Sequence, residues 1–362
     1  MRKTCVTAAV LGAFVLLGAQ QAFSEGKAIV WHGYAQTRLM NYQGDFTRLK
    51  VERLSLSAQT QLQPDLNAYI EVYHHPALPP DAVFDQFRHY LESAYLNLKL
   101  EDGSNLRVGR GRRMTFGITP SIPGRKFSNY GLTSSTFTMA RVNGVQYFFD
   151  KGGYDGGVGI TTTHRIGGSV AGDVSRPGSA RTSMISDKDI PNNINTNLEL
   201  SARFGAKQPN GTRYGITGST GRLDNTDLNY MNAQFTGTYD SKRKTRLGAY
   251  FQVPVQEYLF QGEYFDAQTS NLDHDAWYLI AGYKPKSKAY EAYLKYEESK
   301  VDAPANANSA SWNKKQYGFT VVKPLQKGVD VRLEVERNEE SPGGGAGSVR
   351  NDVAFIELFT AF

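Results

Sequence analysis

The sequence predicts an all-β protein, a transmembrane antiparallel up-and-down β-barrel of about sixteen strands. Three observations predict this fold. Apolar and polar residues alternate with a period of two in many segments. Short and long connections alternate along the chain, as they should between the two rims of such a barrel. After the N-terminal segment, no apolar run is long enough for a transmembrane helix.

The N-terminus has the pattern of an export signal. Two basic residues precede an apolar core over residues 8–19, and Ala22-Phe23-Ser24 supplies the small residues that a signal peptidase recognises. The apolar core is too short to span a bilayer as a helix. We therefore expect residues 1–24 to be a cleaved signal peptide for Sec export, and residues 25–362 to form one barrel domain.

Composition excludes several classes of function. The single cysteine, Cys5, lies within the predicted signal, so the exported chain would have no disulfide, thiolate nucleophile or thiolate metal site. Without Arg2 and Lys3, 39 basic residues face 35 acidic ones, too small an excess to indicate nucleic-acid binding. The histidines are scattered, and none lies in a recognisable nucleophile motif. We expect no enzyme activity, cofactor or bound metal.

The segment VDVRLEVER, residues 329–337, shows the alternation best. Its valines and leucine share one face, and Asp330, Arg332, Glu334 and Glu336 share the other. In a closed barrel the apolar face meets lipid and the charged face lines the lumen, which must then be wet because dry burial of charge is costly. Sixteen strands also leave room for an aqueous channel. The residues predicted to face the lumen are Asp330, Arg332, Glu334, Glu291, Lys295 and Lys99.

Turn residues divide the chain into strands. The candidate strands cover 28–42, 47–62, 66–76, 88–100, 105–113, 139–150, 154–164, 196–207, 212–222, 229–239, 244–266, 276–284, 289–300, 312–323, 329–338 and 349–362. Longer polar connections are expected at 77–87, 114–138, 165–195, 267–275, 301–311 and 339–348. Pro254 interrupts the segment 244–266, which is either one bulged strand or two strands and a turn. Strand numbers from about fourteen to about eighteen therefore remain open.

The chain stops on an aromatic residue at the end of an alternating segment. In AFIELFTAF, Phe362 shares a face with Leu358 and Ile356. This resembles the C-terminal signature of Gram-negative outer-membrane proteins, which the barrel-assembly machinery reads. Thr360 on the same face is less apolar than that signature usually has.

A block of basic residues lies in the middle of this pattern. The 47 residues from Gly103 to Phe149 contain seven basic side chains and no carboxylate. Such a concentration of charge is unfavourable unless water or an anion offsets it. The seven residues are Arg107, Arg110, Arg112, Arg113, Arg125, Lys126 and Arg141.

The whole chain resembles bacterial porins. LRVGRGRRMTFG (106–117) is similar to the strand-to-loop passage of the phosphate-selective O/P type, and ARVNGVQYFF (140–149) resembles that group's Arg-x-x-Gly-Val-Gln segment. The resemblance implies a trimeric outer-membrane channel for small hydrophilic solutes, in contact with lipid and lipopolysaccharide. In general porins the third long loop, here 114–138, folds into the lumen and sets the constriction. The basic block would then confer a preference for anions, including phosphate.

Two alternatives remain. Strict alternation puts Arg107 and Arg113 on one face of their strand and Arg110 and Arg112 on the other. These arginines therefore either line the lumen or bind lipopolysaccharide phosphates at the outer rim. The protein as a whole could also be a non-channel barrel, that is, an adhesin, a receptor or a scaffold for a partner such as a cytochrome, with 165–195 as its binding loop.

Overall fold

The computed structural model describes residues 28–42, 46–74, 89–118, 124–129, 131–138, 141–170, 183–188, 194–234, 237–303, 311–343, 347–350 and 352–362. Sixteen strands pair with their neighbours in chain order, and β18 (Val353–Ala361) pairs with β1 (Ile29–Tyr42) to close the barrel. Two short strands are additional: β8 (Ser183–Lys188) pairs with β7, and β17 (Val349–Arg350) pairs with β16. The predicted antiparallel barrel of about sixteen strands is confirmed.

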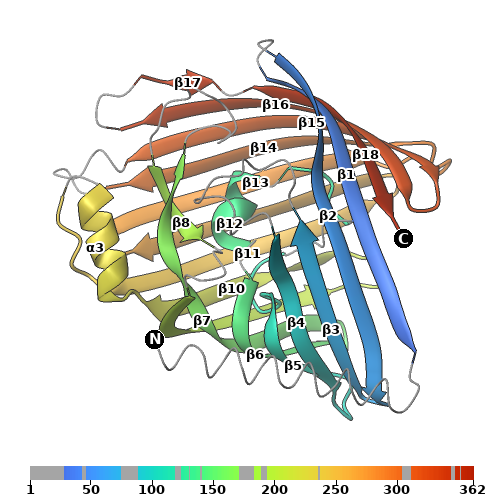
Figure 1. Cartoon of the computed structure of the whole chain (residues 1–362), viewed down its shortest axis with the longest axis horizontal. Helices are drawn as coiled ribbons and strands as arrows, with labels where there is room; N and C mark the ends of the chain where they lie inside the picture. Colours follow the sequence, from blue (N-terminus) through green and yellow to red (C-terminus); the bar gives the residue numbers. More distant parts are fainter. Residues whose placement is uncertain are drawn as a thin grey trace.

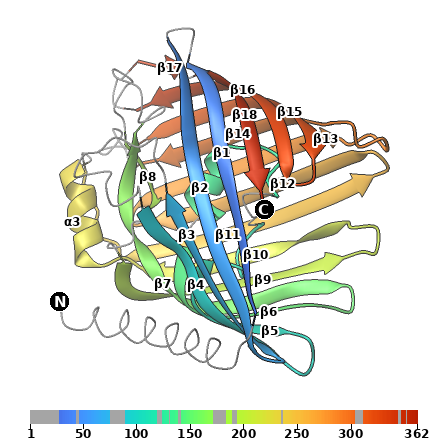
Figure 2. The same ribbon diagram turned by 45° about the vertical axis from the view of Figure 1, so that its right-hand side comes forward.

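The two ends of the barrel differ. Short turns join the strands at the end where the chain stops, which we call the turn rim; the other end, which we call the loop rim, carries α3 (Asn225–Gln234) (Figures 1 and 2). The remaining barrel strands are β2 (Phe46–Gln63), β3 (Leu66–His74), β4 (His89–Lys99), β5 (Asn105–Arg112), β6 (Arg141–Lys151), β7 (Tyr154–Val170), β9 (Ile194–Lys207), β10 (Arg213–Arg222), β11 (Arg243–Val255), β12 (Tyr258–Thr269), β13 (Leu272–Tyr283), β14 (Glu291–Asp302), β15 (Trp312–Gln326) and β16 (Val329–Pro342).

The predicted strand at 229–239 is wrong, because α3 occupies most of this segment. Two aspartates cap the helix reciprocally. Oδ1 of Asp224 accepts the backbone N–H of Asp227 at 2.8 Å, and Oδ2 of Asp227 accepts that of Asp224 at 3.1 Å. These bonds satisfy donors that the first turn of a helix leaves without partners.

Two strands take the place of the predicted segment 244–266. β11 ends at Val255 and β12 begins at Tyr258, with Gln256 in the left-handed region at a φ of 53°. The predicted long connection at 267–275 is also wrong, because β12 and β13 leave only a two-residue turn between them. Compared with the predicted strands, one is missing at α3 and one is added within 244–266, so the total is still sixteen.

Burial in this barrel is the reverse of that in a soluble protein. On β16, Leu333 and Val335 are 42% and 44% exposed, whereas Arg332 and Glu334 are 3% and 0% exposed. The charged side chains face the interior, where other side chains cover them, and the apolar ones face outward. Among the described residues, no helix has the length and apolar character that a membrane span requires.

Candidate functional site

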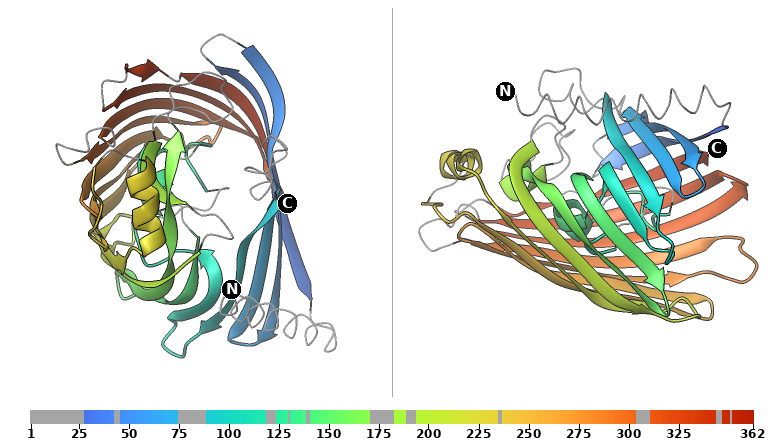
Figure 3. Two further views of the ribbon diagram at one scale, coloured as in Figure 1. Left: turned by 60° about the vertical axis from the view of Figure 1, so that its left-hand side comes forward. Right: turned by 90° about the horizontal axis from the view of Figure 1, so that it is seen from below.

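The connection between β5 and β6, residues 113–140, is called L3 here, and its described parts lie inside the barrel. Figure 1 shows its helical turn η1 (Ser134–Thr138) against the inner side of the strands around β12. In Figure 3 the ring of strands surrounds this segment. The third long connection therefore enters the lumen.

Carboxylates of the barrel wall accept backbone N–H groups of L3. The amide of Ile118 donates to Oε1 of Glu263 on β12 at 2.5 Å, and the amide of Thr133 donates to Oε2 of Glu297 on β14 at 3.1 Å. These amides have no strand partner, so the wall supplies the acceptors that buried backbone donors require.

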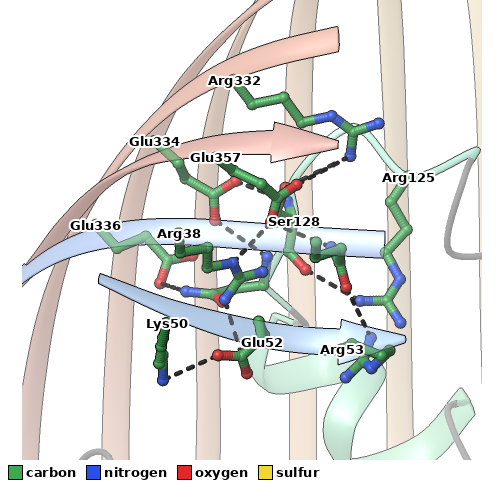
Figure 4. Close-up of polar contacts among 12 residues, drawn as sticks. Arg38, Lys50, Glu52, Arg53, Arg125, Ser128, Arg332, Glu334, Glu336 and Glu357 are labelled. Carbon is green, nitrogen blue, oxygen red and sulfur yellow. Dashed lines mark hydrogen bonds and ion pairs between the residues drawn. The ribbon is translucent and has the colours of Figure 1, made fainter. Parts of the chain in front are cut away.

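The tip of L3 is attached to a different part of the wall (Figure 4). Glu334 on β16 accepts the amide N–H of Ser128 at 2.7 Å and that of Asn129 at 3.1 Å. The Ser128 hydroxyl donates to Glu357 on β18 at 2.7 Å, and Arg38 on β1 donates to Oδ1 of Asn129 at 2.9 Å. Arg38 and Glu357 form a buried ion pair at 2.6 Å. L3 is thus fixed near its beginning at Ile118, at its tip, and toward its end at Thr133.

Two arginines of the basic block share one buried carboxylate. Arg112 lies 3.4 Å from Oε1 of Glu92 on β4, and Arg141 forms a closer ion pair with the same oxygen. Glu92 precedes the acid-free span in the sequence. It lies beside these arginines because β5 pairs with both β4 and β6. Part of the block's charge is therefore offset within the wall.

Arg113 is also in a buried ion pair. Its Nη1 lies 2.7 Å from Oε1 of Glu199 on β9, and Lys244 on β11 lies 3.5 Å from the other oxygen of that carboxylate. Arg113 is 1% exposed, so these contacts hold the start of L3 against the wall.

Arg107 and Arg110 make different contacts from the rest of the block. The Arg107 guanidinium lies 4.0 Å from the ring centroid of Tyr95 and 5.2 Å from that of Phe148. Nε of Arg110 donates to the backbone carbonyl of Leu91 on β4 at 2.8 Å.

The remaining two basic residues of the block lie on L3. Arg125 is buried and donates to the carbonyl of Ser128 at 3.2 Å. Burial, and next the positive charge of Arg53, hold the pKa of Arg125 well below its usual value. Lys126 is half-buried, with its ammonium 5.7 Å from the ring centroid of Tyr293.

A cavity of about 260 Å³ lies between L3 and the wall from β9 to β14. Six basic side chains and one carboxylate line it: Arg112, Arg125, Lys126, Arg203, Arg213, Lys295 and Glu297. Arg203 and Arg213 were not among the residues predicted from the sequence. They lie outside the acid-free span and become part of the site only because L3 crosses the lumen to reach them.

No family model and no curated protein matches the sequence. Solved structures do match. The outer-membrane channel DcaP of Acinetobacter baumannii has a TM-score of 0.62 at 14% identity, covering 93% of this chain and 97% of its own. OmpF of Salmonella typhi, in complex with daunomycin, has a TM-score of 0.62 at 12% identity, and the match covers 94% of this chain and 99% of OmpF. The anion-selective porin of Comamonas acidovorans has a TM-score of 0.58 at 12% identity, and the match covers 93% of this chain and 100% of that porin. The chain has the porin fold.

The other predicted lumen residues lie at different depths of this porin fold, with Lys295 in the cavity beside L3. Glu291 accepts a hydrogen bond from Lys284 at 3.1 Å, and Asp330 accepts one from Arg332 at 3.3 Å. Lys99 is exposed at the end of β4. Lys295 is buried between Glu297 and Glu336, at 3.1 and 3.3 Å.

The three residues of the predicted C-terminal signature are exposed on the outer side of the barrel, whereas Phe355 and Phe359 of the last strand are buried. Ile356, Leu358 and Phe362 are 51%, 43% and 73% exposed. The backbone of Phe362 pairs with Gly33 through hydrogen bonds of 3.0 and 3.1 Å.

The predicted signal peptide at 1–24 lies outside the described residues, as does part of the predicted binding loop 165–195. Within the described part of the chain, no group of side chains suited to hold a metal ion is found.

Proposed function

We propose that the protein is a passive diffusion channel of a Gram-negative outer membrane with a preference for small anions. The closed barrel, its apolar outer face and its charged interior support a water-filled pore through a bilayer. The observation that carries the anion preference is the cavity beside L3, where six basic side chains face one carboxylate.

Ion pairs remove only part of this charge. Arg203 pairs with Asp155 at 3.0 Å, and Lys295 and Arg112 also have carboxylate partners. Arg213, in contrast, donates to the amide oxygen of Gln252 at 3.0 Å. Within the described part of the chain, the six basic side chains that line the cavity face Glu297 and three further carboxylates that pair with them, Glu92, Asp155 and Glu336. A positive potential focused by the low-dielectric wall attracts anions into the pore.

We assign the constriction to Arg112, Arg125 and Lys126 with Arg203 and Arg213 opposite them. Guanidinium groups bind carboxylate or phosphate through paired donors, which suits small oxyanions such as phosphate. Arg113 and Arg141 hold the wall and L3 together.

In this proposal the turn rim faces the periplasm, the barrel-assembly machinery recognises Phe362, and three copies of the protein form a trimer.

Planar-bilayer recording tests this function. In a KCl gradient, the purified barrel should show stepwise conductance and a reversal potential on the anion-selective side. The variant Arg112→Gln/Arg125→Gln/Arg213→Gln should move that potential toward the value for no selectivity. The matched control Lys207→Gln/Lys300→Gln/Lys315→Gln removes two exposed charges and one half-buried charge, all outside the cavity, and should not move it. A folded barrel without conductance would favour the receptor or scaffold alternative.

A further inference from the structure

A cavity of about 740 Å³ lies at the turn rim, between the beginning of β1, the end of β2 and the beginning of β3. It shares no lining residue with the cavity beside L3. None of the described residues that line it is charged. Four of its side chains are amides, those of Gln59, Gln61, Gln63 and Asn67. This wall therefore differs in kind from the cationic constriction.

The amides project into the lumen. Arg38 on β1 reaches the tip of L3, and alternation puts Val30, eight residues earlier, on the same face of the strand. The strand register pairs Val30 with Gln59, and Gln59 with Tyr69 on β3. Residues directly opposite each other in neighbouring strands share a face of the sheet. The cavity is therefore on the inner side of the barrel wall.

Most of these amides are not used by the fold. Within the described part of the chain, the side chains of Gln59, Gln63 and Asn67 have no hydrogen-bond partner. Gln61 donates to the carbonyl of Pro64 at 2.9 Å, which leaves its amide oxygen as an acceptor. Each amide offers both donors and an acceptor. The cavity therefore suits a ligand whose own groups both donate and accept hydrogen bonds.

An aromatic surface lies beside the amides. The rings of Tyr69 and Tyr95 are stacked, with their centroids 5.0 Å apart and their planes at 24°. Tyr69 lies directly opposite Gln59 on one side and Tyr95 on the other. Both rings are half-buried, so part of each faces the lumen. Neighbouring strands are about 5 Å apart, so one small ligand can contact the amides and this apolar surface together.

The walls of the cavity are braced by hydrogen bonds. The Thr60 hydroxyl donates to the carbonyl of Ala28 at 3.2 Å and holds the beginning of β1. The amide of Lys99 on β4 donates to the carbonyl of Asp65 at 2.7 Å and holds the turn between β2 and β3. A wall that is already ordered loses little conformational entropy when a ligand binds.

We infer that this cavity binds an uncharged sugar, with the amides on its hydroxyl groups and the Tyr69–Tyr95 pair against the apolar face of its ring. Each sugar hydroxyl donates and accepts, as each amide does. A small ion would lose water here without gaining a countercharge from the wall. The volume is within the range of small-molecule sites. The site goes beyond the proposed anion channel, and rests on it only for the assignment of the turn rim to the periplasm.

Saturation-transfer NMR with maltose on the folded barrel, in a detergent without a sugar head group, tests the site without requiring conduction. Gln59→Ala/Asn67→Ala should weaken maltose binding by about tenfold, because two amides are lost. The matched control Gln208→Ala/Gln326→Ala removes two exposed amides outside the cavity and should bind maltose as the unmodified protein does. Equal affinity in all three proteins, or no saturable maltose binding by the folded unmodified barrel, would overturn the inference.

Inorganic phosphate separates this site from the constriction. Phosphate should not displace maltose from the unmodified barrel, because the described lining of the cavity has no cation. Gln59→Ala/Asn67→Ala should leave the KCl reversal potential unchanged, because the cavity beside L3 is intact. Displacement of maltose by phosphate would show an anion site and contradict the inference. A barrel that binds maltose without anion selectivity would contradict the proposed function and leave the sugar site supported.

Discussion

The backbone N–H of Ser128 donates to Oε2 of Glu334, with 2.7 Å between nitrogen and oxygen. The other oxygen of this carboxylate accepts the amide of Asn129. One buried side chain on β16 therefore holds the tip of a loop that begins ten strands earlier in the barrel order. The position of L3, and with it the shape of the cavity beside L3, depends on this contact and on the other wall carboxylates.

Replacing Glu334 with alanine should release the tip of L3. Two buried amides lose a charged acceptor, and a hydrogen bond to a charged group contributes about 1.5–3 kcal/mol. We expect the free energy of unfolding to fall by at least about 2 kcal/mol and the open-channel current to become noisier. Urea unfolding and single-channel recording measure the two effects.

Glu339→Ala is the matched control, because that carboxylate belongs to the same strand but pairs with the exposed Arg337. It should change stability by no more than about 0.5 kcal/mol. Equal stability and equal current noise in Glu334→Ala and Glu339→Ala would mean that Glu334 does not hold L3.

Arg113→Ala should affect folding more than selectivity. The change removes the closer of the two cations that pair with the buried Glu199, and breaking a buried pair costs about 3–5 kcal/mol. The reversal potential of the folded fraction should move much less than in the triple variant that removes Arg112, Arg125 and Arg213. Arg113→Lys, which keeps the charge, should recover part of the stability. A selectivity change as large as that of the triple variant, with normal stability, would place Arg113 in the pore instead.

Anion preference should fall as the pH rises through about 8. Burial, and next the charge of Lys284, lower the pKa of Lys126 to about 8, so its ammonium is charged below that pH and neutral above it. Loss of one positive charge at the cavity wall weakens the attraction for anions. Reversal potentials in KCl at about pH 6.5 and about pH 9.5 measure the change.

Lys126→Arg provides the control, since a guanidinium remains charged at both pH values. It should keep the anion preference at the higher pH, and Lys126→Gln should show the weaker preference at both. The same pH-dependent change in all three proteins would show that another group titrates.

The barrel was predictable because its signal is local. Alternation with a period of two identifies a strand from its own residues, and turn residues mark its ends. The failure at 229–239 has a local cause as well: Leu228 and Met231 bury one face of a helix whose start depends on the reciprocal bonds of Asp224 and Asp227.

The site was predictable only in part, because its electrostatics are not local. The acid-free span contributes Arg112, Arg125 and Lys126 to the lining of the cavity, and L3 does enter the lumen. The carboxylates that offset Arg112, Arg113 and Arg141 come from Glu92 and Glu199, on strands outside the span. Barrel closure and the path of L3 bring these groups together, and neither follows from residue spacing along the chain.

The reversal potential of the unmodified channel in a KCl gradient tests the central proposal most directly. The six basic side chains around the cavity predict stepwise conductance with chloride more permeant than potassium, and a potential that moves toward zero when Arg112, Arg125 and Arg213 become glutamine. A reversal potential on the cation-selective side, or one that the triple variant leaves unchanged, would contradict it.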